Sequence, residues 1–103
     1  MLDFFKKLLG TETVDFADLK SKGAIIVDVR SKSEFESGHI KNSINIPLNN
    51  LSQQLNRLKN KEQIIITCCA SGMRSASAKT ILKNNGYTQV YNGGGWYGLQ
   101  NKL

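Results

Sequence analysis

The residues best suited to do chemistry in this chain of 103 residues lie in one short stretch, from Cys69 to Arg74. A β-branched run at 64–67 precedes it and predicts a strand that is buried on both faces, and an alanine-rich segment follows it and predicts a helix. A cysteine that ends a strand and faces a helix N-terminus lies where an anion is favoured, because the free N–H groups and the dipole of the first turn stabilise a thiolate. We therefore predict that Cys69 is a reactive nucleophile in a cradle of backbone amides.

The loop after Cys69 supplies the groups that we expect to bind a substrate anion. Its backbone N–H groups can hold negative charge on the sulfur and on an incoming anion. Gly72 permits a tight curl, Arg74 adds a permanent charge and a fork that fits an oxyanion, and Ser75 is expected to cap the next helix. The predicted substrate-binding residues are Ala70, Ser71, Gly72, Met73 and Arg74.

Four other polar residues have structural interpretations. Cys68 is expected in the core, because adjacent strand residues point to opposite faces, with a role as a resolving thiol kept as an alternative. Asp28 ends an apolar run and must be paired if it is buried. Asp28 and Arg30 are interpreted as structural ion or hydrogen-bond partners, and Arg30 is also a candidate substrate contact. His39 is interpreted as a structural hydrogen-bonding residue.

Composition and spacing exclude several other classes of function. The single His39 and the two adjacent cysteines lack the spacing of a zinc site, and the glycine run at 93–95 lacks the context of a dinucleotide loop, so we expect no metal and no cofactor. The formal net charge of +6 favours anions, but the basic residues are scattered, so no nucleic-acid partner is expected. The segment 1–9 does not resemble a signal peptide, no stretch is long enough to span a membrane, and no disulfide framework is present; a cytoplasmic location is expected.

Strand and helix patterns alternate about five times along the chain, which predicts an α/β domain with a parallel sheet covered on both faces. The expected strands are 12–14, 24–29, 43–47, the run beginning at 64, and 89–91. The expected helices are 1–9, 15–23, 31–35, 48–58 with Asn49 or Asn50 as its cap, 75–85 and 96–103, and 92–95 is expected to be a flexible loop.

This order of elements places the reactive stretch at one edge of the sheet. Right-handed crossovers bring the carboxyl ends of parallel strands to the same edge, where open α/β sheets bind ligands. Cys69, the loop after Val29 and the loop after Tyr91 are all expected there. Trp96 is interpreted as a lid on the core near this edge.

Three stretches, in order, resemble the signatures of rhodanese domains. The first is Asp28-Val29-Arg30 with Glu34-Phe35-x-x-Gly38-His39-Ile40 and Ile44-Asn45-Ile46-Pro47; the second is the loop from Cys69 to Ser75; the third is Val90-Tyr91-Asn92-Gly93-Gly94 with Trp96. The resemblance implies a single rhodanese-like domain over 1–103, with an extra helix at 1–10 outside the match. It implies a five-stranded, mostly parallel sheet with helices on both faces.

The resemblance also implies that Cys69 holds sulfane sulfur as a persulfide. The expected function is a sulfurtransferase that takes sulfur from a small anionic donor such as thiosulfate and passes it to a thiol or cyanide. A sulfur-accepting or reducing protein such as a thioredoxin is a further candidate partner.

Two alternatives stay open. One is a sulfur-carrier or partner-binding module, which would have the same sequence features. The other is a cysteine-dependent phosphatase, because related dual-specificity phosphatases share the fold and use Cys-x5-Arg. Here four residues separate Cys69 from Arg74, one fewer than in that motif, which favours sulfur over a phosphoryl group.

Overall fold

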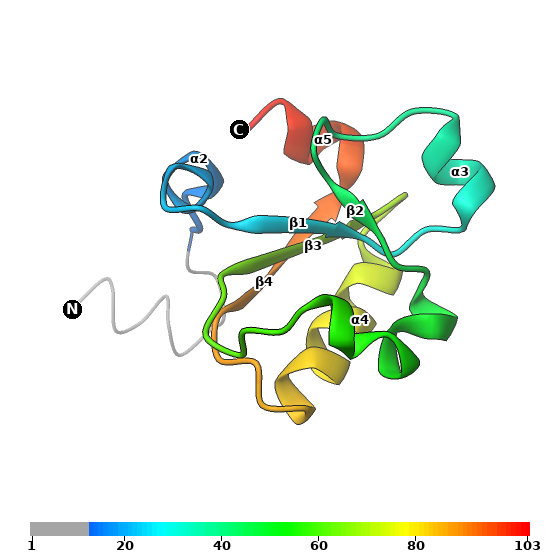
Figure 1. Cartoon of the computed structure of the whole chain (residues 1–103). Coiled ribbons are helices and arrows are strands. Elements are labelled where there is room, and N and C mark those ends of the chain that lie inside the picture. Colours follow the sequence, from blue (N-terminus) through cyan, green and yellow to red (C-terminus); the bar gives the residue numbers. More distant parts are fainter. Residues whose placement is uncertain (1–12) are drawn as a thin grey trace.

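The computed structural model of the chain describes residues 13–103, in which a parallel sheet lies between layers of helices (Figure 1). The strands are β1 (Ile25–Asp28), β2 (Ile44–Asn45), β3 (Ile65–Cys69) and β4 (Val90–Gly95). The α-helices are α2 (Phe16–Ser21), α3 (Lys32–Glu36), α4 (Met73–Asn84) and α5 (Trp96–Gln100). Two 3-10 helices follow β2, namely η1 (Leu48–Gln53) and η2 (Leu55–Arg57). The helix predicted over 1–9 lies outside the described residues.

The strands run parallel in the order β2-β1-β3-β4, which confirms the predicted α/β class. The sheet of the described residues has four strands, one fewer than expected. Thr13 and Val14, the described part of the strand predicted at 12–14, do not belong to it. The chain turns directly into α2 at this point, since the Asp15 side chain caps that helix by accepting the Asp18 N–H at 3.0 Å.

Each face of the sheet has its own apolar cluster, because successive strand residues point to opposite faces. Val27 and Ile65 face α4 and the 3-10 helices, whereas Ile26 and Ile66 face α2 and α5. Burial on both faces accounts for the nearly continuous apolar runs of β1 and β3.

The predicted α-helix over 48–58 is wrong in type. Two short 3-10 helices replace it, and they begin after Pro47 with no side-chain cap from an asparagine. The backbone N–H groups of Gln54 and Leu58 donate to the carbonyl three residues earlier, as in a 3-10 helix. The hydroxyl of Tyr87 donates to the carbonyl oxygens of Leu55 at 3.2 Å and Leu58 at 2.5 Å and ties this tighter segment to the core. The leucine spacing nevertheless predicts correctly which side of this segment is buried, since Leu51 and Leu58 both lie in the core.

The predicted loop over 92–95 is also wrong, because β4 continues through this glycine run. Its glycines permit close backbone contact. A Cβ on Gly95 would lie 2.8 Å from the carbonyl oxygen of Ala70, and one on Gly93 would lie 2.9 Å from that of Thr67. The glycines therefore let β4 pack tightly against β3 and the loop after it.

Substituting Gly93 with alanine is expected to destabilise the fold by about 1–3 kcal/mol, because the added methyl group would overpack the site. Its Cβ would lie 2.7 Å from Cδ2 of Leu99 and 2.9 Å from Cγ2 of Ile66. Gly98→Ala is the matched control, because that Cβ meets nothing within 4 Å and Gly98 lies in α5. Urea unfolding should show a loss only for Gly93→Ala; equal losses would contradict the packing argument.

Candidate active site

Cys69 is the last residue of β3, and its sulfur lies inside a curl of backbone that leads into α4. The sulfur accepts hydrogen bonds from the N–H of Gly72 at 2.9 Å and from the N–H of Ser75 at 3.4 Å. Gly72 permits the curl, since its φ of +108° lies in the left-handed region. The side chain of Cys69 is only 1% exposed, so these backbone groups form its immediate polar surroundings.

Two opposing effects act on the Cys69 thiol. Burial is the largest and raises its pKa, because a thiolate loses solvation in the interior. The Ser75 hydroxyl and the backbone N–H groups of Ser75, Gly72 and Ser71 stabilise the thiolate and together lower the pKa below its ordinary value. The site therefore favours an ionised, nucleophilic sulfur.

Ser75 is not the helix cap that the pattern predicts. Gly72 is the N-cap of α4, and Ser75 lies buried in the first turn. The helix begins earlier than expected because the left-handed Gly72 already turns the chain into it. The Cys69 thiol donates to the Ser75 hydroxyl oxygen at 3.5 Å, so this hydroxyl belongs to the surroundings of the sulfur.

Two side chains that the sequence did not single out also reach this corner. The hydroxyl of Thr67 donates to the Ser75 carbonyl at 2.9 Å and ties the first turn of α4 to β3. The Ser75 hydroxyl donates to Oδ1 of Asn92 on β4 at 2.6 Å. Only the folded sheet brings these groups together.

Arg74 is paired with a carboxylate of the same chain. It forms two hydrogen bonds with the Glu34 carboxylate of α3, at 2.7 and 2.9 Å. This pairing with Arg74, followed by the backbone N–H of Ser31, lowers the pKa of Glu34 to about 2. The fork that was predicted to bind an oxyanion is therefore occupied by a carboxylate of the same chain.

The other predicted loop residues lie at the rim of the cradle. Ala70 and Ser71 are exposed, and the Met73 side chain is 81% exposed. Among the described residues, no side chain of the three is hydrogen-bonded to the sulfur, and of their backbones that of Ser71 acts on it by lowering the Cys69 pKa.

Arg30 and Asp28 form a buried ion pair. The Asp28 side chain is fully buried, and Nη2 of Arg30 lies 2.7 Å from Oδ2 of Asp28. The remaining Arg30 contacts are the carbonyls of Glu34 and Gly38 and the ring of Trp96, whose centroid is 4.8 Å from the guanidinium carbon. Arg30 is only 4% exposed, so the structure places it as a structural partner beneath Trp96.

Cys68 and His39 are also placed as structural residues. Cys68 lies in the apolar cluster on the opposite face from Cys69, and burial raises the pKa of its thiol to about 12. The His39 ring stacks on Phe35 with centroids 3.7 Å apart, and its Nδ1 lies 2.7 Å from the Phe35 carbonyl oxygen. Cys68 therefore packs in the core, and His39 is bonded to the backbone of α3.

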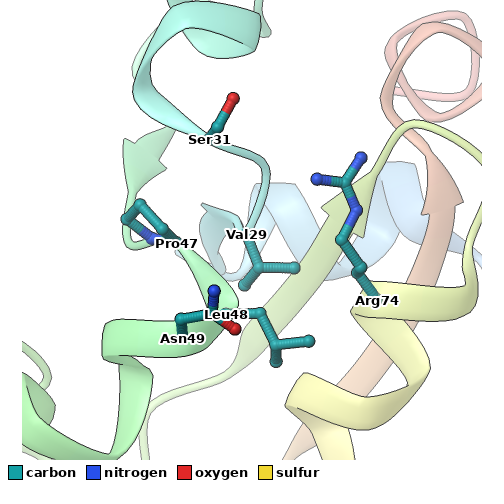
Figure 2. A pocket seen from close by; sticks show the side chains of 6 residues that line it. All are labelled: Val29, Ser31, Pro47, Leu48, Asn49 and Arg74. Carbon is teal, nitrogen blue, oxygen red and sulfur yellow. The ribbon is translucent and has the colours of Figure 1, made fainter.

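A surface hollow of about 290 Å³ opens beside the cradle (Figure 2). Val29, Ser31, Pro47, Leu48, Asn49 and Arg74 line it. Val29 lines the hollow and also lies near the nucleophile. Its N–H donates to the Cys68 carbonyl, and its side chain belongs to the same apolar cluster as Cys69. Figure 2 shows Arg74 on α4 facing Pro47 and Asn49 across the hollow. The lining of this hollow therefore combines apolar side chains with the polar groups of Ser31, Asn49 and Arg74.

Comparison with known proteins shows the family to which the chain belongs. A family model described as Rhodanese-like domain matches residues 7–102. The chain belongs to the rhodanese-like domain family. This confirms the resemblance. The matched residues include 7–10, which are part of the segment that was expected to lie outside the match.

Relatives of this rhodanese-like domain include both small and longer proteins. The uncharacterized protein YqhL of Bacillus subtilis (strain 168) is 39% identical over 69 residues, which are 67% of this chain and 54% of YqhL. Thiosulfate sulfurtransferase PspE of Escherichia coli (strain K12) is 34% identical over 70 residues, 67% of each protein. A crystal structure of a rhodanese-like domain protein from Staphylococcus aureus superposes with a TM-score of 0.70 and 33% identity, covering 82% of this chain and 86% of that one.

The chain spans only part of several relatives. It covers about half of YqhL and 14% of the tRNA sulfurtransferase of Thermoplasma acidophilum. It covers 25% of a tRNA uridine(34) hydroxylase from Buchnera aphidicola. The chain is thus similar to parts of proteins that are named for different activities.

Two further observations concern the described residues. Within residues 13–103, no three His, Cys, Asp or Glu side chains are grouped so that they could hold a metal ion. In the same part of the chain, the helices are too short or too polar to cross a membrane.

Replacing Glu34 with glutamine is expected to remove a pH-dependent part of the domain's stability. The folded pKa of about 2 lies below the ordinary value for glutamate, so the unfolded chain binds the proton first as the pH falls. The stabilisation by Glu34 is therefore present above about pH 4.3 and is lost as the pH falls toward 2. Urea unfolding at several pH values measures the free energy of unfolding. The difference in this free energy between the unchanged chain and Glu34→Gln should become smaller as the pH falls through this range.

The matched control for Glu34 is Glu36→Gln on the same helix. The Glu36 carboxylate is exposed and lies 4.0 Å from Lys32, so its loss should change stability little at any pH. A Glu34→Gln difference that stays constant with pH would contradict the role of the Arg74 pair.

Proposed function

We propose that this rhodanese-like domain is a sulfurtransferase that holds sulfane sulfur as a persulfide on Cys69. The observation that supports this most strongly is the position of the Cys69 sulfur, within hydrogen-bond distance of the N–H groups of Gly72 and Ser75 at the start of α4. These donors stabilise a thiolate before the reaction, and their cradle suits the negative charge of a persulfide after it.

The proposed reaction has two displacement steps. First, the Cys69 thiolate attacks the outer sulfur of a donor such as thiosulfate; the sulfur–sulfur bond of the donor breaks, and sulfite leaves with the electron pair. Second, a thiolate or cyanide attacks the outer sulfur of the Cys69 persulfide and forms a new persulfide or thiocyanate. The sulfur–sulfur bond to Cys69 breaks in this step and regenerates the thiolate, so no external oxidant or reductant is needed.

The substrate-binding groups that we propose are the backbone N–H groups of the loop 70–74. Arg74 contributes from the rim of the hollow, where its charge is shared with Glu34. Arg30 is left out of this site because its side chain is buried against Asp28. The hollow lined by Val29 and Leu48 suits the organic part of a thiol acceptor.

Partners and location follow from the same chemistry. We propose a small anionic sulfur donor, a thiol or cyanide acceptor, and a reducing protein such as a thioredoxin as a further acceptor. A cytoplasmic location fits two free cysteines with no disulfide between them.

A sulfur-carrier role is the second candidate, and the lengths of the relatives favour it. The chain covers only 14% of the Thermoplasma tRNA sulfurtransferase, so a similar domain there forms a small part of a larger protein. In such a role Cys69 would pass its sulfur to a protein acceptor, and the first displacement step would be unchanged.

The phosphatase alternative is disfavoured by Arg74. A phosphoryl group in a cradle needs the arginine fork, and here the fork is bonded to Glu34 at 2.7 and 2.9 Å. The loop is also one residue shorter than Cys-x5-Arg, with four residues between Cys69 and Arg74.

A turnover assay tests the proposed activity. The purified chain is incubated with thiosulfate and cyanide, and release of thiocyanate is followed. A parallel incubation with an aryl phosphate ester follows phosphate release. We expect thiocyanate and no phosphate; phosphate release without sulfur transfer would instead establish the phosphatase alternative.

A further inference from the structure

The side chain of Asn92 reaches from β4 into the corner where β3 ends and α4 begins. Its Oδ1 accepts the Ser75 hydroxyl at 2.6 Å and the Gly94 N–H at 2.9 Å, and its Nδ2 donates to the Gly72 carbonyl at 3.4 Å. Ser75 and Gly72 are themselves hydrogen-bonded to the Cys69 sulfur. Asn92 therefore contacts the groups that surround the sulfur without contacting the sulfur itself.

The Ser75 hydroxyl has a single proton and three acceptors within reach. The acceptors are Oδ1 of Asn92 at 2.6 Å, the Gly72 carbonyl oxygen at 3.0 Å and the Cys69 sulfur at 3.5 Å. While Cys69 is a thiol, its own proton points to the Ser75 oxygen, and the hydroxyl proton can go to Asn92. Once Cys69 has lost its proton to solvent, the thiolate competes with Asn92 for that hydroxyl proton.

We propose that Asn92 is a positioning residue that competes with the Cys69 thiolate for the Ser75 hydroxyl proton, so that this hydroxyl stabilises the thiolate less than it otherwise would and the sulfur is more nucleophilic. The Asn92 contact is the shortest of the three, so it is the strongest competitor for the proton. A thiolate with fewer hydrogen-bond donors is more basic, and the nucleophilicity of a thiolate rises with its basicity. The backbone donors at Gly72 and Ser75 remain in place and keep the thiol readily ionised.

The inference rests on the proposed role of Cys69 as the nucleophile. Titratable groups on the elements around the sulfur are Asp28 and Arg30 at the end of β1, Cys68 on β3, Arg74 on α4 with its partner Glu34, and Tyr91 on β4. Substitution of Asn92 leaves all of these side chains in the protein. A change in the pH profile of Cys69 that occurs only while Ser75 is present therefore reports on the hydrogen bond between Asn92 and Ser75.

The test is the pH dependence of alkylation of Cys69 by iodoacetamide. Cys68→Ala serves as the background, so that one thiol remains to react. In Asn92→Ala the neutral Gly72 carbonyl is the remaining competitor of the charged thiolate for the Ser75 hydroxyl proton. The pH midpoint of alkylation should therefore fall by about one pH unit, the size of one hydrogen bond to a charged group. The rate of alkylation at high pH, where Cys69 is fully ionised, should fall as well, because a less basic thiolate is a weaker nucleophile. In Asn92→Asp, which keeps the shape of the side chain, a carboxylate faces Ser75 and the midpoint should rise.

Two controls separate this role from a merely structural one. In a Ser75→Ala background, Asn92→Ala should no longer move the midpoint, because the hydroxyl it controls is gone. Asn85→Ala, at the far end of α4, should leave the profile unchanged. Midpoints that move in the same direction for Asn92→Ala and Asn92→Asp, or an Asn92→Ala shift that persists without Ser75, would overturn the proposal.

Alkylation measures the thiol and needs no sulfur substrate. A chain that shows these shifts but releases no thiocyanate would overturn the proposed sulfur transfer and leave the role of Asn92 standing. A chain that transfers sulfur but shows no shift would overturn the role of Asn92 alone.

Discussion

Replacing Cys69 with serine is expected to abolish sulfur transfer while the domain stays folded. The serine hydroxyl does not ionise at neutral pH, so neither displacement step has a nucleophile. Turnover of thiosulfate and cyanide should fall by roughly three orders of magnitude or more, because the covalent route itself is lost. Serine has nearly the shape of cysteine, and the backbone donors of Gly72 and Ser75 can bond to its oxygen, so the thermal unfolding transition should change little.

Cys68→Ala is the matched control for this substitution. Cys68 is the next residue along β3 and is fully buried on the other face, with its thiol held protonated by a pKa of about 12. Its loss should reduce stability slightly and leave the turnover per folded molecule unchanged. If Cys68→Ala abolished transfer as completely as Cys69→Ser, the assignment of a single nucleophile would be wrong.

Removing Arg30 is expected to cause a large loss of stability. Arg30→Ala would leave the Asp28 carboxylate buried without its partner, and breaking one side of a buried ion pair costs about 3–5 kcal/mol. The packing of the guanidinium against Trp96 would be lost as well. Urea unfolding at neutral pH should therefore show a midpoint far below that of the unchanged chain.

The double variant Asp28→Asn with Arg30→Met distinguishes the charge effect from lost packing. Because it removes both charges and keeps an apolar side chain beneath Trp96, it should recover part of the loss seen in Arg30→Ala. Lys32→Ala, which breaks the exposed pair with Glu36, is the control for a surface ion pair and should change stability by at most about 1 kcal/mol. A loss for Arg30→Ala no larger than that for Lys32→Ala would contradict the structural role.

The sequence was most informative where local chemistry alone decides the structure. The apolar runs at 24–29 and 64–67 predicted β1 and β3, because a strand buried on both faces needs such a run. Gly72 predicts the tight curl between β3 and α4, because glycine readily adopts the left-handed conformation that the turn requires. The Ser31–Glu34 capping box is also a local signal, and it correctly marked the start of α3.

The structure adds to or departs from these expectations where distant parts of the chain meet. Arg74 and Glu34 are 40 residues apart, and nothing in their spacing shows that the fork is already paired. The glycine run at 93–95 has the composition of a loop, yet it forms a strand because the backbones of Thr67 and Ala70 pack against it. Asn92 was assigned to that loop, so its contact with Ser75 could not be anticipated.

The most direct test of the central claim is the intact mass of the chain after incubation with thiosulfate and removal of the excess. The persulfide account predicts the addition of one sulfur atom, located on Cys69 by peptide mapping and removed again by cyanide or a thiol. The Cys69→Ser chain treated in the same way should gain no mass. A chain that gains no sulfur, or a sulfur that is still added when Cys69 is replaced, would contradict the account.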